Sequence, residues 1–281
     1  MSDADDVVRL RMDLAYDGTH FSGWASQPGR RTVQETVESA WGLILRSKPP
    51  PLTVGGRTDA GVHARGSVAH VDLPVEAWES LPGRGTRSPS ESALRRLAGT
   101  LPSDVVVHSV QVAPAGFDAR FSALRRRYSY RLGDSLASLD PLRRHDTVRL
   151  KKPVEVARMN QAAAALLGLH DFAAYCRRRE GATTRRTLLR FVFDREADGV
   201  VVGTLEADAF CRSMVRSLVG AVVPVGQGLR ELEWPRTVLA GLARDPGVTV
   251  MPARGLCLEE IVYPPDAELA ARAEQTRARR S

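Results

Sequence analysis

The stretch GGRTDAGVHARG, residues 55–66, places one carboxylate, Asp59, among small residues. Arg57 lies two positions before it and His63 four positions after it. A carboxylate can act as a general base or a nucleophile while it stays ionised, and a nearby guanidinium favours the ionised form. Flanking glycines let a substrate approach the backbone closely. The segment therefore has the residue types of a catalytic loop.

Three other roles for Asp59 fit the same residues. Its carboxylate can accept backbone amides in an Asx turn, a common use of aspartate in loops. It can form a purely structural ion pair with an arginine. It can also bind a metal with His63, His70 and Asp72, although the spacing of the two histidines fits no common metal motif. The chemistry of the loop does not choose among these roles.

Hydrophobic periodicity predicts the elements that position this loop. Alternating apolar residues indicate a strand at 7–16, and a helical stripe follows it. Thr32 and Glu35, at the start of that stripe, have the spacing of a capping box. Two predicted strands flank this loop, so Asp59 is expected on a hairpin.

The order of predicted elements is β-α-β-β-α-β up to residue 112, and it repeats with an added helix in the second half. A duplicated split β-α-β pattern is the ferredoxin-like arrangement, an antiparallel sheet with helices on one face. We therefore predict an α+β protein with ferredoxin-like halves at 1–112 and 113–265 and a catalytic cleft between them. Residues 266–281 are expected to form a charged tail.

Composition predicts a basic globular protein with a polyanionic partner. The 281 residues are 43 % hydrophobic, enough to build cores, and the formal net charge is +7. No apolar run reaches the length of a membrane span and no signal segment is visible, so we expect a cytoplasmic protein without membrane contact. Cys176, Cys211 and Cys257 are widely spaced, a pattern that predicts neither a disulfide framework nor a zinc cluster.

Arginine is concentrated in two segments, residues 120–131 and residues 176–190. The first interleaves five arginines with Phe121, Tyr128 and Tyr130, a combination that can neutralise phosphates and stack on bases. A solvated strand edge protected by charge is the alternative. The second is a Gly/Thr loop with six arginines, which suits a phosphate grip. No recognition-helix signature accompanies them, so the pattern favours RNA over DNA.

Several blocks resemble the tRNA pseudouridine synthase A family. GRTDAGVHA is the most specific, and the blocks run in family order from about residue 12 to about residue 263. The others are YDGTHFSGW, TVQETVE, RFSALRRRYSY, HDFAAY and FCRSMVRSLVG. The resemblance thus covers nearly the whole chain. Its departures are Ala25, where the family usually has glutamine, and a longer, more basic connector at 81–90.

The resemblance implies isomerisation of uridine to pseudouridine at positions 38–40 of the tRNA anticodon arm. It implies no metal, no organic cofactor, and a homodimer whose subunits together hold the tRNA. In the matching blocks Asp59 is the nucleophile, Arg216 is its basic partner, and Tyr128 packs on the flipped uracil. Arg57 contacts the RNA, although Arg57 and Arg216 can exchange roles. The resemblance leaves open whether Asp59 attacks the sugar or takes a proton from it.

Other functions fit some of these residues. An RNA-binding protein without catalysis would need the basic segments but not the set Asp59, Tyr128 and Arg216. A synthase of the same family acting on another RNA would keep that set. A metal-dependent hydrolase using Asp59 and His63 would be inhibited by a chelator, whereas the synthase would not.

Overall fold

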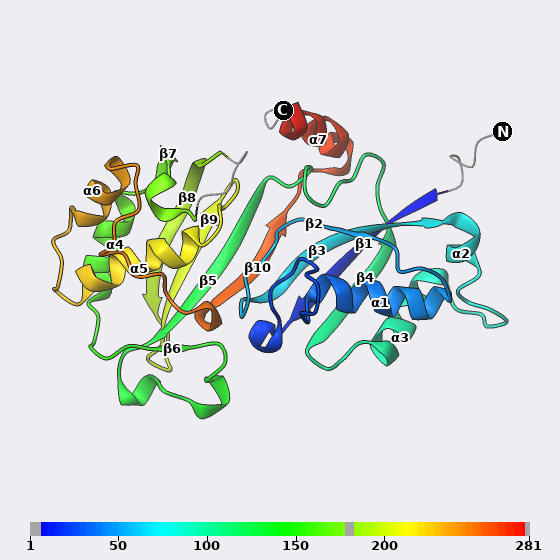
Figure 1. Cartoon of the computed structure of the whole chain (residues 1–281), viewed down its shortest axis with the longest axis horizontal. Coiled ribbons are helices and arrows are strands. Elements are labelled where there is room, and N and C mark those ends of the chain that lie inside the picture. Colours follow the sequence, from blue (N-terminus) through cyan, green and yellow to red (C-terminus); the bar gives the residue numbers. More distant parts are fainter. Residues whose placement is uncertain (1–6, 178–182, 279–281) are drawn as a thin grey trace. The chain divides into compact units, whose positions relative to one another are not determined.

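The structure is a computed structural model that describes residues 7–177 and 183–278 (Figure 1). The chain divides into two compact units. Unit 1 comprises Met1–Leu124 and Glu260–Ser281, and unit 2 comprises Arg125–Glu259. Residues 113–124 and 260–265, expected in the second half, therefore belong to unit 1.

Unit 1 is built on an antiparallel sheet. Its elements are β1 (Val7–Tyr16), α1 (Val33–Leu45), β2 (Leu52–Val54), β3 (His63–Pro74), α2 (Val75–Glu79), α3 (Pro89–Thr100), β4 (Val105–Val112) and α7 (Leu269–Ala278). β1 pairs antiparallel with β3 on one side and with β4 on the other, and β2 pairs antiparallel with β3. The predicted order β-α-β-β-α-β is confirmed, with the short helix α2 added.

The core of unit 1 follows the alternation of β1. Leu10, Met12 and Leu14 are buried, and the indole Nε1 of Trp41 on α1 lies 3.2 Å from Met12 Sδ. α1 begins directly after Thr32, but the Thr32 side chain makes no capping hydrogen bond. The predicted capping box is therefore wrong, although the predicted start of the helix is right.

Residues 266–281, expected as a charged tail, include the helix α7. Leu269 and Ala273 of α7 are buried. Ser122 Oγ donates to the Leu269 carbonyl (3.1 Å), and Arg277 Nη2 donates to Asp118 Oδ2 (2.9 Å). These contacts dock α7 on unit 1.

Unit 2 repeats the scheme with two short strands added. Its elements are β5 (Arg125–Gly133), β6 (Val148–Arg149), α4 (Val156–Ala164), β7 (Gly168–Asp171), β8 (Arg185–Arg195), β9 (Val201–Ala207), α5 (Met214–Gly226) and α6 (Trp234–Ala240). β9 pairs antiparallel with β5 and β8, β7 pairs antiparallel with β8, and β6 pairs parallel with β5. Strand β10 (Leu256–Val262) then carries the chain back into unit 1.

Each unit is thus a mixed α+β fold on a mostly antiparallel sheet, which confirms the predicted fold class. Helices α1 and α3 contact each other in unit 1, and α4 and α5 do so in unit 2. Within residues 7–177 and 183–278, no helix is long and apolar enough to cross a membrane.

Candidate active site

Asp59 lies in the loop that joins β2 to β3, the hairpin position predicted from the sequence. The N–H of Gly55 donates to the carbonyl of Val68 (2.8 Å), which extends the ladder past the end of β2. The N–H of Val62 donates to the carbonyl of Asp59 (3.1 Å) and closes a turn there. Asp59 is half-buried and Arg57 is exposed. The loop therefore presents Asp59 from a tight turn of defined shape.

The segment after β1 holds this loop by backbone hydrogen bonds. The N–H of Trp24 donates to the carbonyl of Thr58 (3.1 Å), and the N–H of Gly61 donates to the carbonyl of Phe21 (3.2 Å). The loop is thus anchored on both sides of Asp59. A functional group on an anchored support keeps its direction when a substrate arrives.

Two glycines let the segment after β1 reach the loop. Gly23 has a φ of +98°, a conformation that favours glycine, and a Cβ there would lie 2.9 Å from the carbonyl oxygen of Thr58. A Cβ at Gly18 would overlap the carbonyl of Val62. The small residues of the block YDGTHFSGW therefore serve a close backbone approach.

The alternative of a metal site combined Asp59 with His63, His70 and Asp72. In the structure each of the last three side chains has a hydrogen-bond partner in the protein. The partners are the Gly18 N–H on His63 Nδ1 (3.1 Å), the Ala119 N–H on His70 Nδ1 (3.0 Å) and the Arg9 guanidinium on Asp72 (2.7 Å). In the part of the chain that the structure describes, no three His, Cys, Asp or Glu side chains gather as a metal site. These contacts make structural use of the three side chains.

In unit 2, Tyr128 lies on β5 and Arg216 in the first turn of α5. Tyr128 is buried, and the ring of Phe210 meets it edge-on with the ring centroids 5.1 Å apart. Arg216 is half-buried, and its Nε donates to the carbonyl of Met251 (2.5 Å). The N–H of Met251 donates in turn to the Arg216 carbonyl (3.2 Å). The guanidinium is therefore held at the start of α5 by the segment before β10.

Tyr130, two positions after Tyr128, is bound to the same segment. Its Oη donates to the carbonyl of Pro252 (2.6 Å). Burial raises the pKa of the Tyr130 phenol above its ordinary value, and the charge of Arg216 opposes this rise. A neutral phenol and a guanidinium thus share this part of unit 2.

The four predicted site residues come from both units. Arg57 and Asp59 share one loop of unit 1, whereas Tyr128 and Arg216 belong to two elements of unit 2.

The basic segment 120–131 is used partly by the protein itself. Arg126 Nη1 donates to the carbonyl of Asp208 (2.8 Å), and Arg131 Nη2 lies 3.1 Å from a Glu196 carboxylate oxygen. Both arginines are only 7 % exposed, so these two side chains do not present their charges to a phosphate at the surface. β5 is also paired with neighbouring strands on both sides, so the alternative of a solvated strand edge is wrong for residues 125–131.

Known proteins of high similarity establish the family of this chain. A sequence profile of the family described as tRNA pseudouridine synthase matches residues 162–264. A tRNA pseudouridine synthase A from Frankia casuarinae is 56 % identical, over 98 % of this chain and 96 % of that protein. The chain belongs to the tRNA pseudouridine synthase A family. The same-named proteins of Streptomyces griseus (55 % identical; 96 % and 93 % covered) and Bifidobacterium longum (43 %; 98 % and 100 %) agree.

Membership of the tRNA pseudouridine synthase A family confirms the resemblance and makes the chain an isomerase enzyme. Sequence reasoning missed the residues that hold the Asp59 loop in place, which are Phe21 and Trp24 through their backbones and Gly18 through its lack of a side chain. Their block, YDGTHFSGW with its two glycines, was a visible signal for a close approach. Its partner in space was not visible from spacing alone.

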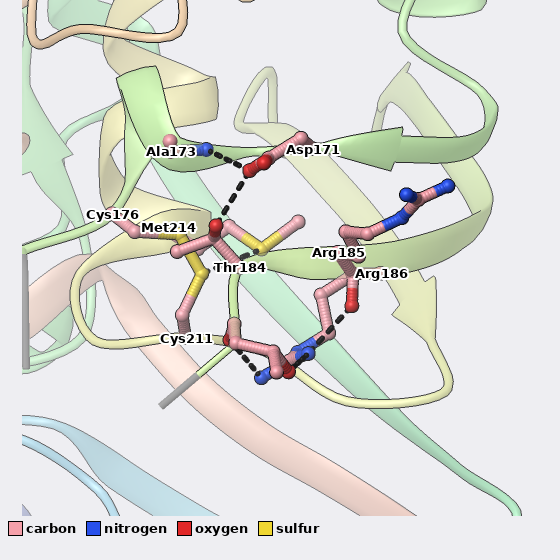
Figure 2. The surroundings of a disulfide bond; sticks show 9 residues. Asp171, Ala173, Cys176, Thr184, Arg185, Arg186, Cys211 and Met214 are labelled. Carbon is pink, nitrogen blue, oxygen red and sulfur yellow. Dashed lines mark hydrogen bonds between the residues drawn. A yellow bond between two sulfur atoms is a disulfide. The ribbon is translucent and has the colours of Figure 1, made fainter. Parts of the chain in front are cut away.

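The synthase also pairs Cys176 with Cys211 in a disulfide, with the two Cα atoms 5.7 Å apart (Figure 2). The spacing of the cysteines gave no signal for this single bond, because the two cysteines are 35 positions apart and only folding brings them together. The N–H of Arg177 donates to the carbonyl of Arg212 (2.9 Å) beside the bond. The disulfide therefore joins the first residue of the basic segment 176–190 to the residues that directly precede α5.

The basic segment 176–190, predicted as a phosphate grip, lies partly outside the described residues, at 178–182. In its described part, Arg186 Nη1 donates to Thr183 Oγ1 (3.0 Å), and burial lowers the pKa of the Arg186 guanidinium. Figure 2 shows the Arg186 side chain turned back toward Arg185, whose carbonyl accepts a hydrogen bond from its Nη1. One of the six arginines thus shapes the segment itself.

Reduction of the disulfide is expected to destabilise the synthase by about 2–4 kcal/mol, because it releases a closed loop in the unfolded chain. The measurement is urea unfolding with and without dithiothreitol. Cys211→Ser is expected to lose the response to reductant, whereas Cys257→Ser keeps it. Equal midpoints for the oxidised and reduced wild type would refute this role for the bond.

Proposed function

We propose that this synthase converts uridine to pseudouridine at positions 38–40 in the anticodon stem-loop of tRNA, with Asp59 as the nucleophile acting on a flipped-out uridine. The supporting observation is the anchoring of the Asp59 loop on both sides by the segment after β1. Anchoring on both sides fixes the position of Asp59, and this suits a carboxylate that must meet one atom of a large substrate.

The reaction needs few groups because it is an isomerisation. The N1–C1′ bond breaks, the uracil rotates, and C5 bonds to C1′. The C5 hydrogen leaves as a proton, and N1 gains a proton. No electron is gained or lost, so a carboxylate can assist the exchange of bonds at C1′ without a redox partner or an organic cofactor.

The other predicted residues serve access and charge. A stacked uridine must leave the helix before its C1′ can be reached, at a cost of a few kcal/mol. Tyr128 packs on the extruded uracil, and Arg216 pairs with Asp59 to keep its carboxylate ionised. Arg57, exposed on the Asp59 loop, contacts the RNA. The proposal therefore requires both units of the chain for one turnover.

The proposed setting is a homodimer in the cytoplasm with tRNA as the partner and with neither metal nor organic cofactor. The net charge of +7 supports a polyanionic partner. A cytoplasm keeps most thiols reduced, so activity is to be measured with and without dithiothreitol. Light scattering of the purified protein tests the dimer.

The test of the proposed function uses tRNA transcripts that carry C5-tritiated uridine at one position only, 38, 39, 40 or 55. Loss of the C5 hydrogen reports the reaction, since substrate and product have equal mass. We expect release from 38, 39 and 40, none from 55, and no effect of EDTA. Release from 55 alone would contradict the proposed position. Tight binding without release from any transcript would favour the RNA-binding alternative, and inhibition by EDTA would favour a metal enzyme.

A further inference from the structure

A side-chain hydrogen bond ties β1 to the Asp59 loop. Tyr16 is the last residue of β1, and its Oη lies 2.8 Å from Thr58 Oγ1. Both residues are buried, with 5 % of Tyr16 and 7 % of Thr58 exposed. Thr58 directly precedes Asp59 in the chain. The bond therefore acts one residue away from the proposed nucleophile, out of reach of solvent.

Thr58 is held twice. Its carbonyl accepts the N–H of Trp24, and its hydroxyl bonds to Tyr16. The ring of Trp24 in turn lies against the ring of Tyr16, with the centroids 6.0 Å apart. Two independent contacts on one residue fix its rotation as well as its place. The backbone that leads into Asp59 is held with it.

We infer that Tyr16 is a positioning residue for catalysis, acting through the hydroxyl of Thr58 to hold the Asp59 carboxylate in one orientation. This inference rests on the proposed role of Asp59 as nucleophile. Phenylalanine at position 16 would fill the same space in the core, so the hydroxyl serves the bond and not the packing. Small displacements of a reacting group lower rates steeply, by about 10²-fold for 1 Å.

The experiment compares Tyr16→Phe, Thr58→Val, their double variant and Thr58→Ser in single-turnover tritium release from tRNA. We expect each of the first two to lower the rate about tenfold with the tRNA Kd within about twofold. The double variant is expected to be no slower than the slower single variant, because one bond is lost in all three. Thr58→Ser keeps the hydroxyl and is expected to keep most of the rate.

Tyr175→Phe is the matched control. Tyr175 is buried in unit 2, and its Oη donates to the carbonyl of Pro235 (2.6 Å). Loss of the Tyr175 hydroxyl is expected to lower the free energy of unfolding without a change in the tritium-release rate. A wild-type rate in Tyr16→Phe, or a double variant that loses the product of the two single effects, would overturn the inference.

A second readout is independent of activity. Amide hydrogen exchange of a peptide covering residues 58–62 is expected to quicken about tenfold in Tyr16→Phe and to stay unchanged in Tyr175→Phe. If wild type releases no tritium while Tyr16→Phe still loosens the loop, the proposed function fails and the anchoring of the Asp59 loop by Tyr16 stands. Unchanged exchange in Tyr16→Phe overturns the anchoring itself.

Discussion

Asp59→Asn is expected to lower kcat for pseudouridine formation by at least about 10³-fold and to leave the Kd for tRNA within about twofold. Asparagine keeps the shape of the side chain but loses the charge that assists bond exchange at C1′. The backbone bonds around the loop involve main-chain atoms of Thr58, Asp59 and Gly61, so the variant keeps the groups that form them. The product is measured by nuclease digestion of the tRNA and chromatography of the nucleosides.

Asp72→Asn is the control for charge. Asp72 lies on β3 in the same unit and pairs with Arg9, so its replacement removes one negative charge from unit 1 without touching the loop. We expect its kcat to stay within about twofold of wild type, with some loss of stability. Equal activity of Asp59→Asn and Asp72→Asn would remove Asp59 from the chemistry.

Gly18→Ala is expected to destabilise the synthase by about 3 kcal/mol and to lower the single-turnover rate about 10²-fold. The new Cβ would overlap the carbonyl of Val62, a backbone atom that moves only with the loop itself. Displacement of Val62 strains the turn closed by its N–H on Asp59 and the bond from the Gly18 N–H to His63. Both effects are measured on one preparation, by urea unfolding and by tritium release.

Gly99→Ala is the matched glycine control. Gly99 lies in α3 with no neighbouring atom within 4 Å of the place a Cβ would take. Alanine there is expected to be neutral or to stabilise by up to about 1 kcal/mol, with an unchanged rate. If Gly18→Ala matches Gly99→Ala in both measurements, the close approach of the segment after β1 to the Asp59 loop affects neither stability nor catalysis.

The sequence pattern predicted the features that depend on a few neighbouring residues, namely the strands, the helices and the hairpin. Strict alternation on β1 buried Leu10, Met12 and Leu14, and the residues flanking GRTDAGVHA formed the expected hairpin. Order of elements and fold class followed from such signals. So did the position of Asp59 on the hairpin loop, because strand and turn preferences act over a few residues.

The start of helix α1 could be predicted from the sequence, but the hydrogen bond that would cap it could not. Thr32 precedes α1, but its side chain makes no capping hydrogen bond. Ser88 and Glu91 do form a capping box on α3, which was not predicted because residues 81–90 were interpreted as a connector. A hydroxyl side chain at a helix start has several rotamers, and its surroundings choose among them.

Contacts between distant segments were not predictable from spacing. The bond from Tyr16 to Thr58 spans 42 positions, the disulfide 35, and the Arg277 bond to Asp118, which docks α7, spans 159. Each depends on how strands and loops pack, and a single sequence carries no direct record of packing. The resemblance of the blocks identified Asp59, whereas the structure was needed to find what holds it.

The most direct test of the proposal that Asp59 carries out the isomerisation is single-turnover tritium release with enzyme in excess, for wild type and Asp59→Asn side by side. The substrate is a tRNA transcript with C5-tritiated uridine at position 39. We expect complete release by wild type, no release by the variant in the same time, and equal retention of the tRNA by both on a filter. Equal release rates from the two proteins would contradict the proposal.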